Sequence, residues 1–323
     1  MSSSSRTPPT AARSILVLGA GELGLPMLTH LSALAPSQPY PVHLTVLLRP
    51  FTISNPSGSK ARDITTLKNL GISLLGGDLI SASPADLTAL FRPYHTIIDC
   101  SGYGRPKGGQ LHVARAVLAA GVRKYIPWQF GVDYDVIGRG SGQDLFDEQL
   151  DLRDLLRAQS ATSWVVVSTG MFTSFLFEPW FGVVESPADG GGITVVRALG
   201  SWENGVSVTS PEDIGRVTAR VVFDDEIRDT VVFSAGDTVT YQRLADVVEE
   251  AVGQPVEREA WTLDYLRDQL RKDPENVVIK YRVVFAESRG LMWKMGDTIN
   301  HKWNMRLEDV RTHALMHLKL QNV

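Results

Sequence analysis

Apolar residues along this chain fall either into short continuous runs or into runs with helical spacing. Residues 15–18 form a continuous apolar run, which is typical of a strand buried on both faces of a parallel sheet. After a glycine-rich turn, apolar residues recur at helical spacing from 25 to 34. The same succession repeats, with further strands predicted at 43–49, 72–75, 96–100, 124–127 and 164–168. This alternation predicts an α/β fold with a doubly wound (Rossmann) parallel sheet.

The turn after the first predicted strand has the spacing Gly19-x-Gly21-x-x-Gly24, with Glu22 and Leu23 between the last two glycines. In such a turn the first glycine permits a tight exit from the strand, and the second lets the backbone approach a pyrophosphate. The third lets the helix lie close to the sheet. The free N–H groups and the dipole at the helix start favour an anion. The turn predicts a dinucleotide site, and a purely structural turn is the alternative.

Arg49 closes the second predicted strand, where a residue that contacts the adenosine ribose is expected. An acid at this place suits the free 2′-hydroxyl of NAD, whereas an arginine suits the 2′-phosphate of NADP. Lys60 and Arg62, which we place in the next loop, are candidate helpers. The predicted cofactor is NADP(H), and a solvated basic residue at a strand end is the alternative.

The second half of the chain is less regular. Five aromatic residues occur among the twelve positions from 170 to 181, and this segment is either the wall of a substrate pocket or part of the core. We predict a disordered tail at 1–13, a dinucleotide-binding domain at 14–169 and a smaller α/β substrate lobe at 170–323. Part of 210–235 is expected to pack back on the sheet. Further helices are predicted at 211–223, 241–252, 263–271, 277–286 and 307–318.

Composition narrows the classes of function. The 323 residues are 43% hydrophobic and 21% charged, and the net charge of −4 offers no electrostatic attraction to nucleic acid or acidic membranes. No apolar run reaches the roughly 18 residues of a membrane span. A single cysteine, Cys100, excludes a disulfide framework, and no metal-ligand set is evident. We therefore expect a cytoplasmic monomer or homodimer that acts on a small molecule.

One polar residue interrupts the apolar face of the helix predicted at 143–158. Leu145, Gln149, Leu152 and Leu156 lie at positions i, i+4, i+7 and i+11, and so share one stripe. Burying an amide without partners costs on the order of 1–3 kcal/mol. Gln149 should therefore bond to backbone, cofactor or substrate, and an ordinary satisfied core glutamine is the alternative.

Several segments together resemble the isoflavone reductase-like, or NmrA-like, atypical short-chain reductases, and look most like their fungal CipA-type members. The resemblance covers nearly the whole chain after the tail. It implies an NADPH-binding domain, a smaller C-terminal lobe and reduction of phenolic or other conjugated small molecules. The segments that carry it are Gly19–Gly24, Arg49, Lys60, Gln110, residues 121–131 (GVRKYIPWQFG), residues 170–172 (GMF) and residues 210–215 (SPEDIG).

The predicted site combines these motifs with residues at the strand ends. Its cofactor-binding residues are Gly19, Gly21, Glu22, Leu23, Gly24, Arg49, Lys60, Asp78, Ser101, Gly102, Gln110, Gln129 and Phe130. Its substrate-contacting residues are Trp128, Met171, Phe172, Phe175 and Trp180.

Two residues depart from the family's pattern. Gln149 stands where the resembling reductases carry a catalytic lysine, three residues after a phenylalanine, and Gln129 replaces the glutamate of their "S-E-F-G". A glutamine can donate a hydrogen bond but cannot act as an acid or base.

We therefore predict an NADPH-dependent reductase of a small aromatic or polyketide-like secondary metabolite, with hydride transfer to a conjugated carbonyl or imine. Gln149 would orient the acceptor, and Tyr134, with Asp133 nearby, would supply the proton. Two alternatives remain, because fold alone does not separate them. One is a non-redox dehydratase, isomerase or cyclase on the same scaffold, and the other is an NADP(H)-sensing regulatory protein.

Overall fold

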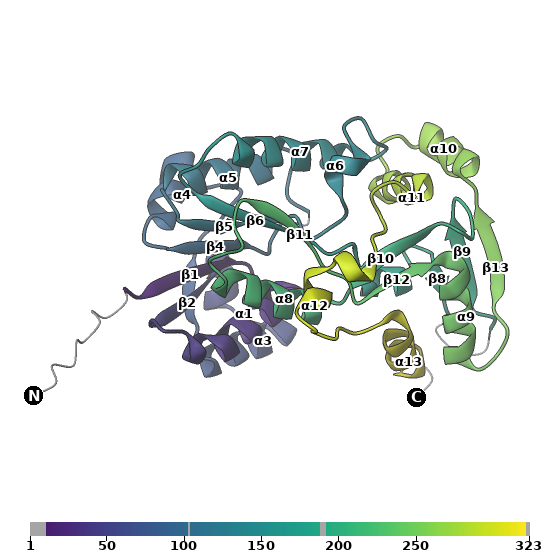
Figure 1. Ribbon diagram of the computed structural model, residues 1–323, viewed down its shortest axis with the longest axis horizontal. Helices are drawn as coiled ribbons and strands as arrows, with labels where there is room; N and C mark the ends of the chain where they lie inside the picture. The colour runs from purple at the N-terminus through teal and green to yellow at the C-terminus, as the bar shows by residue number, and fades with distance from the viewer. Residues whose placement is uncertain (1–10, 103, 188–191, 321–323) are drawn as a thin grey trace, which may run out of the picture. The chain divides into compact units, whose positions relative to one another are not determined.

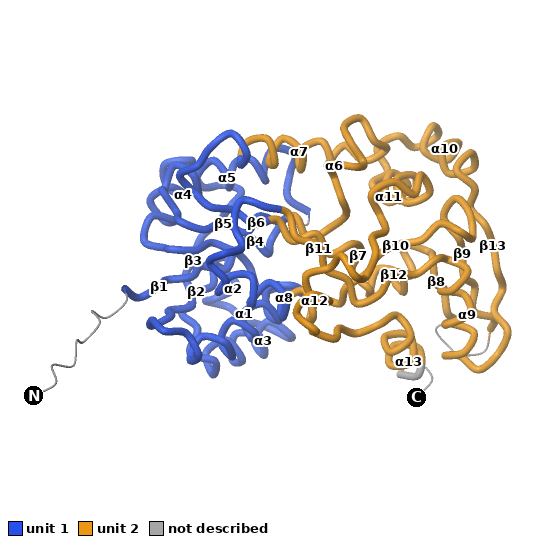
Figure 2. Tube along the Cα trace, in the orientation of Figure 1, with its two compact units in different colours: residues 1–128, 156–165, 215–230 blue, residues 129–155, 166–214, 231–323 orange. Residues whose placement is uncertain are grey.

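The computed structural model describes residues 11–102, 104–187 and 192–320 (Figure 1). Its backbone contacts divide the chain into two compact units (Figure 2). This division differs from the predicted single boundary after residue 169, because the chain passes between the units several times. Unit 1 comprises residues 1–128, 156–165 and 215–230, and unit 2 comprises residues 129–155, 166–214 and 231–323.

Seven strands form one sheet in the order β11-β6-β5-β4-β1-β2-β3. From β3 to β6 each registered pair is parallel, and residues 15–18 of β1 are buried as expected. The predicted doubly wound α/β fold is confirmed. The order reverses direction beside β1, so the carboxyl ends of β1 and β4 form the switch point where such sheets bind ligands. The strands are β1 (Arg13–Leu18), β2 (Val42–Leu48), β3 (Ser73–Gly76), β4 (Thr96–Asp99), β5 (Lys124–Ile126), β6 (Ser163–Ser168) and β11 (Thr230–Phe233).

The predicted tail at 1–13 includes one residue of the sheet. Arg13 opens β1, and its backbone N–H donates to the carbonyl oxygen of Pro41 at 2.9 Å. The guanidinium of Arg13 also forms two hydrogen bonds with Asp225, at 2.8 and 2.6 Å. Residues 1–10 of the predicted tail lie outside the described residues.

Helices flank this sheet within unit 1, with α4 and α5 above it and α1 and α3 below it in Figure 1. The loop predicted around Lys60 and Arg62 is in fact α3, since two buried residues three positions apart, Ile64 and Leu67, give that helix an apolar face. The helices are α1 (Gly24–Leu34), α2 (Pro50–Ser54), α3 (Gly58–Asn69), α4 (Pro84–Phe91), α5 (Gly109–Ala119) and α8 (Pro211–Phe223), and a 3-10 turn, η1 (Ala35–Ser37), follows α1.

Residues 215–230 belong to unit 1 although they follow much of unit 2 in the chain. The buried ammonium of Lys124, in β5, donates to the carbonyl oxygens of Val221, Val222 and Asp224 at 2.8, 3.2 and 2.8 Å. These three oxygens lie at the end of α8, where a helix leaves its last carbonyls unsatisfied. The lysine therefore ties the end of α8 to the sheet.

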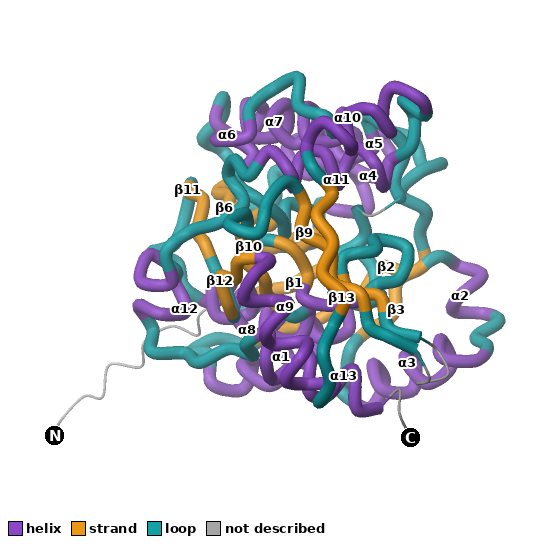
Figure 3. The backbone as a smooth tube through the Cα atoms, turned by 90° about the vertical axis from the view of Figure 1, so that its right-hand side faces the viewer, coloured by secondary structure: helices purple, strands orange, loops and turns teal. Residues whose placement is uncertain are grey.

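Unit 2 contains two small sheets, β12-β10-β7 and β13-β9-β8 (Figure 3). In the second of these sheets, β13 runs parallel to β9. Their strands are β7 (Met171–Phe172), β8 (Val184–Glu185), β9 (Val195–Leu199), β10 (Gly205–Thr209), β12 (Asp237–Thr240) and β13 (Glu257–Trp261). The helices are α6 (Tyr134–Ile137), α7 (Asp144–Arg157), α9 (Tyr241–Val252), α10 (Leu263–Lys272), α11 (Val277–Glu287), α12 (Ile299–Lys302) and α13 (Val310–Leu320), with 3-10 turns η2 (Thr173–Phe177) and η3 (Met295–Asp297).

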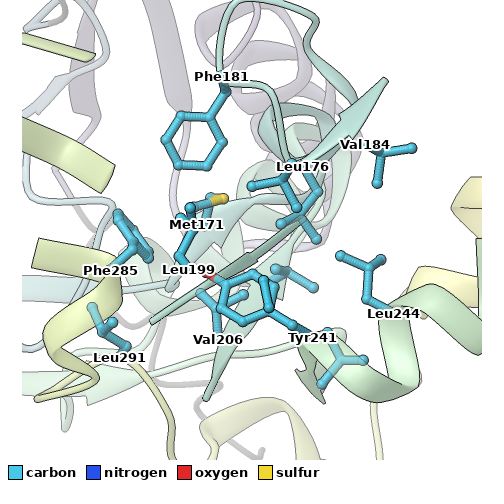
Figure 4. Packing of buried hydrophobic residues seen from close by; sticks show 14 of the residues in the cluster. Met171, Leu176, Phe181, Val184, Leu199, Val206, Tyr241, Leu244, Phe285 and Leu291 are labelled. Carbon is cyan, nitrogen blue, oxygen red and sulfur yellow. The ribbon is translucent and has the colours of Figure 1, made fainter. Parts of the chain in front are cut away.

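The core of unit 2 gathers apolar side chains from both small sheets and the helices around them (Figure 4). Leu176, Phe181, Val206 and Tyr241 are each at most 1% exposed. The last helix begins at Val310 rather than at the predicted residue 307, because the Asp309 carboxylate accepts the N–H of Thr312 at 2.7 Å and so caps the helix there. In the described part of the chain no helix is long and apolar enough to cross a membrane.

Candidate functional site

The glycine turn between β1 and α1 has the geometry that its spacing predicts. Gly19 has a φ of +93°, in the left-handed region that favours glycine. A Cβ atom at Gly24 would lie 2.1 Å from the carbonyl oxygen of Gly19, so no side chain fits between the helix and the strand end. A Cβ atom at Gly21 would meet no atom within 4 Å. The fold therefore requires Gly19 and Gly24, whereas Gly21 faces open space.

The start of α1 favours an anion. Its first turn contains no acidic residue, and its N-cap is Leu23, whose side chain offers no capping oxygen. The positive end of the helix dipole is therefore uncompensated by the helix itself. Leu23 is buried and packs below the turn, and Glu22 is exposed.

A cavity of about 380 Å³ lies in unit 1 over this turn. Among its lining residues, Gly19, Arg49, Gly77 and Ser101 lie one or two positions after the carboxyl ends of β1, β2, β3 and β4, the edge where doubly wound sheets bind ligands. Six of the predicted cofactor-binding residues line it, namely Gly19, Gly21, Arg49, Lys60, Asp78 and Ser101.

Two cations and one carboxylate stand around the cavity. Arg49 is exposed directly after β2. The Lys60 ammonium lies 3.4 Å from the carbonyl oxygen of Ala20 and 3.0 Å from the Asp63 carboxylate, which links α3 to the glycine turn. The Asp78 carboxylate accepts the backbone N–H of Ile80 at 2.9 Å. That bond, together with others from the same turn and the charge of Arg49, lowers the pKa of Asp78, so this group is ionised at neutral pH.

A buried ion pair holds the loop after β4. The Arg105 guanidinium, which also lines the cavity, donates to both oxygens of Asp99 at 2.8 and 2.9 Å. It donates further to Ser101 Oγ at 2.7 Å and to Gln110 Oε1 at 3.3 Å. Our sequence analysis missed Arg105; the available signal was an acid at the end of a buried strand, which needs a cation when buried.

Gly102 and Gln110, both predicted to bind the cofactor, are not among the residues that line the cavity. A Cβ atom at Gly102 would lie 2.1 Å from the Trp128 indole and 2.3 Å from the Gln110 amide nitrogen. That nitrogen donates to the carbonyl oxygen of Gly102 at 3.3 Å. These three residues therefore support the loop that carries Ser101.

The residues predicted to be catalytic belong to unit 2, where one buried arginine lies among them. Arg153 is 0% exposed, and its Nη1 donates to Asp135 Oδ2 at 2.7 Å and lies 3.7 Å from Asp133 Oδ1. The centre of its guanidinium is 5.1 Å from the centre of the Tyr134 ring. We had not predicted Arg153. It lies four residues after Gln149 on α7, so a charged residue within the apolar stripe was the feature of the sequence that could have identified it.

Gln129 bonds directly to this arginine, and Gln149 is linked to it through Gln129. Gln129 Oε1 accepts from Arg153 Nε at 2.8 Å, and Gln129 Nε2 donates to the backbone oxygen of Gln149 at 2.8 Å. Gln129 is 1% exposed, and both ends of its amide are engaged. This favours a structural role over the cofactor contact that we predicted. Phe130, also predicted to contact the cofactor, is 6% exposed in unit 2.

Gln149 is buried on the stripe where its spacing places it, beside Leu152 and Leu156, which are fully buried. The side chain of Leu145 lies outside the described residues. Within the part of the chain that the structure describes, Gln149 Oε1 is buried and has no hydrogen-bond partner. An unpaired buried acceptor is costly, so this amide remains available to a ligand donor.

Tyr134 lies in α6 with its ring edge-on to Phe146, the ring centres being 4.9 Å apart. Burial raises the pKa of Tyr134 to about 12, although the charge of Arg153 opposes the rise. The phenol therefore keeps its proton throughout the neutral range.

The predicted substrate-contacting segment is part core and part exposed. Met171 packs in the core of unit 2, and Phe172 is 8% exposed. Phe175 is half-buried and Trp180 is 41% exposed. The rings follow one another, with 5.7 Å between the centres of Phe172 and Phe175 and 5.4 Å between those of Phe175 and Trp180. Trp128 lies half-buried in unit 1.

Fold and cavity together define a doubly wound α/β protein with a glycine turn of the spacing typical of dinucleotide-binding proteins. The model of the NmrA-like family matches residues 12–306, and the chain belongs to that family. A protein of Gibberella moniliformis (strain M3125 / FGSC 7600) described as an "NmrA-like family domain-containing oxidoreductase" is 45% identical over 302 residues, which cover 93% of this chain and 96% of that protein.

Solved structures share the fold at low sequence identity. The binary complex of leucoanthocyanidin reductase with NADPH from Vitis vinifera has a TM-score of 0.73 at 19% identity, covering 93% of this chain and 98% of that one. AtPrR2 with NADP+ and (+)pinoresinol has a TM-score of 0.73 at 16% identity, covering 94% of this chain and 98% of that one. The closer likeness to CipA-type members stays a prediction.

The open space at Gly21 yields a test of the glycine turn. Gly21→Ala should leave the unfolding free energy nearly unchanged but weaken NADP+ binding about tenfold or more, or ~1.4 kcal/mol, because the methyl group would stand where a pyrophosphate approaches. Gly24→Ala is the matched comparison and should lower the unfolding free energy by roughly 1–3 kcal/mol through overlap with the strand end. Urea unfolding and titration calorimetry measure both. Equal NADP+ affinity in Gly21→Ala and the parent protein would contradict a phosphate site here.

Proposed function

We propose that this protein is an NADPH-dependent reductase of a small aromatic or polyketide-like metabolite. The observation that carries the proposal is the cavity over the open Gly21 backbone, with Arg49 and Lys60 on its rim. A pyrophosphate needs close backbone approach and the start of a helix, and a 2′-phosphate needs a cation at the end of the second strand. The cavity meets both requirements within unit 1.

In this proposal the backbone from Gly19 to Gly24 holds the pyrophosphate. The Arg49 guanidinium pairs with the 2′-phosphate in a charge-assisted contact, and Lys60 adds positive charge beside it. Arg105 keeps the Ser101 loop closed against the same cavity. When bound, NADPH supplies the hydride. The 45% identical relative described as an oxidoreductase supports this activity, as do the Vitis vinifera and AtPrR2 complexes with NADPH and NADP+.

The substrate side of the reaction is assigned to unit 2. Reduction of a conjugated carbonyl or imine leaves negative charge on oxygen or nitrogen, which must be met by a hydrogen-bond donor and then by a proton. Gln149 orients the hydride-accepting substrate through its side-chain amide. Tyr134 keeps a proton that it can deliver to the reduced substrate. The half-buried and exposed rings of Phe175 and Trp180 offer a surface for an aromatic substrate.

One observation favours a second candidate. Gln149 cannot ionise, so it supplies no acid or base at the position where the resembling reductases carry a lysine. A non-redox dehydratase, isomerase or cyclase that retains NADP(H) would need no acid at this position. It is the runner-up to the reductase.

Transfer of deuterium from NADPH labelled at C4 distinguishes these functions. Each C4 face is labelled separately and offered with a panel of conjugated phenolic ketones, quinones and imines. The reductase transfers one label into product and consumes NADPH in equal amount. Unlabelled product without NADPH consumption would establish the non-redox enzyme. Tight NADP(H) binding without turnover across the panel would favour a nucleotide-sensing regulatory protein.

Cofactor preference tests the role of Arg49. We expect NADPH to bind at least about tenfold tighter than NADH, or ~1.4 kcal/mol, and Arg49→Ala to remove most of that difference. Arg92→Ala, which removes an exposed arginine at the end of α4, is the control and should leave the preference intact. Titration calorimetry with both nucleotides provides the measurement, and equal affinities in the parent protein would reject the assignment.

Substitutions at the half-buried and the buried aromatic residues of segment 170–181 test whether the segment binds substrate. Phe175→Ala should raise KM for the substrate about tenfold, or ~1.4 kcal/mol, while NADPH affinity changes less than about twofold. Phe177→Ala, from the buried part of the same segment, should instead lower the unfolding free energy by roughly 3–5 kcal/mol. If Phe175→Ala lowers stability and leaves KM unchanged, the segment is core and has no substrate-binding role.

A further inference from the structure

We propose that Arg153 is the positioning residue of the reacting groups on unit 2, and that it acts on Gln149 through Gln129. The inference deepens the proposed function and rests on it, because it assumes that Gln149 and Tyr134 meet the substrate. Arg153 acts through other residues and does not itself meet the substrate, since its side chain is 0% exposed.

The position of Arg153 is fixed by contacts with two other segments of the chain, residues 129–135 and the end of β6. Its Nε reaches Gln129 at 2.8 Å, its Nη1 reaches Asp135 at 2.7 Å, and its Nη2 lies 3.5 Å from Ser168 Oγ at the end of β6. A buried guanidinium is strongly disfavoured unless it is paired and its donors are satisfied. These partners therefore hold one geometry, and the segment 129–135 is drawn onto the middle of α7.

Gln129 can do what a carboxylate of the same length cannot. Its oxygen accepts from Arg153 and its nitrogen donates to the Gln149 backbone oxygen, both at 2.8 Å. A glutamate at this position would still accept from the guanidinium but would offer no N–H to the carbonyl. The amide is thus the element that transmits the position of Arg153 to Gln149.

Gln129 bonds to the backbone of Gln149, which leaves the Gln149 side chain out of this contact. The Gln149 carbonyl lies within α7, and Gln129 adds a bond to it from outside the helix. This fixes the helix turn from which the Gln149 amide projects. Its Oε1 is buried and lacks a hydrogen-bond partner among the described residues, so no hydrogen bond within the described chain fixes that oxygen.

Arg153 also contacts the other two residues assigned to the site. The guanidinium lies against the Tyr134 ring and is 3.7 Å from Asp133 Oδ1. A second arginine near the same helix, Arg139, pairs with Asp151 and Asp154 at 2.6 and 2.7 Å, but its side chain is half exposed. Arg139 touches none of the site residues and serves as a matched control.

A double-mutant cycle between Gln129 and Gln149 tests whether Gln129 transmits the position of Arg153 to Gln149. With the best substrate of the panel, Gln129→Glu should lower kcat about tenfold and change KM for NADPH less than about twofold. In the Gln149→Leu background, which keeps the backbone carbonyl but lacks the amide, the same change should cost less than about twofold. Equal losses in both backgrounds would mean that Gln129 acts on stability alone, and the proposal would be overturned.

Conservative replacement of the arginine adds a second test. Arg153→Lys keeps the charge but loses the fork that reaches Gln129 and Asp135 together, and should lower kcat at least about tenfold with unchanged NADPH affinity. Arg139→Lys should keep parental kcat. If Arg153→Lys matches Arg139→Lys, the arginine has no positioning role. If Arg153→Lys fails to fold, Gln129→Glu decides the question.

A spectroscopic measurement separates failure of this inference from failure of the proposed function. In the isotope-labelled protein, Gln129→Glu should shift the carbonyl ¹³C resonance of Gln149 and the side-chain Nε resonance of Arg153. Shifts confined to residue 129 and its chain neighbours would overturn the proposal. Shifts of both resonances in a protein that transfers no hydride would support the network and reject the reductase.

Discussion

The close approach of α1 to the end of β1 is the constraint on which the proposed cofactor site depends. No side chain fits at Gly24, whose Cβ would lie 2.1 Å from the Gly19 carbonyl oxygen. Because the helix packs this closely, its N-terminus lies at the carboxyl edge of the sheet, beside the ends of β2, β3 and β4. The cavity with Arg49 on its rim follows from that placement.

Two buried arginines organise the loops that follow neighbouring strands. Arg105 closes the loop after β4 around Asp99, and Arg153 gathers the segment that follows β5 around Gln129 and Asp135. In each case a charge taken out of water is stabilised by a carboxylate and by further hydrogen bonds. Removing the carboxylate partner would leave the arginine as an uncompensated buried charge, so the ion pair stabilises the observed conformation of each loop. Loops held in this way can present backbone and side-chain groups to a ligand without further ordering.

The replacement of an ionisable residue by Gln149 fits this arrangement. The interior of unit 2 around α7 already holds one full positive charge at Arg153, whose ion-pair partners Asp133 and Asp135 are partly exposed. A second cation at Gln149 would be desolvated close to the first. A neutral amide avoids that repulsion while keeping a donor and an acceptor, and its backbone carbonyl is used as a point of attachment.

Much of unit 1 could be predicted from the sequence. Apolar runs alternating with helical segments predicted β1, β2, β3, β4, β5 and β6. The spacing of three glycines predicted the turn, and the residues at strand ends and in the next loop supplied Arg49, Lys60, Asp78 and Ser101, which line the cavity. Helical spacing predicted that Gln149 lies on a buried stripe. α3 was missed, since its apolar face rests on only two residues, Ile64 and Leu67.

Only the tertiary structure decided which residues meet. Arg153 bonds to Gln129 and Asp135, which are 24 and 18 positions away in the chain, and periodicity reports that a face is buried but not what covers it. The strands of the two small sheets have only two to five residues each, so their pairing partners and not their own sequences define them. Local sequence thus determined the elements of unit 1 and the residue types at their ends. The contacts of Arg153 join segments that are distant in the chain, which no local pattern specifies.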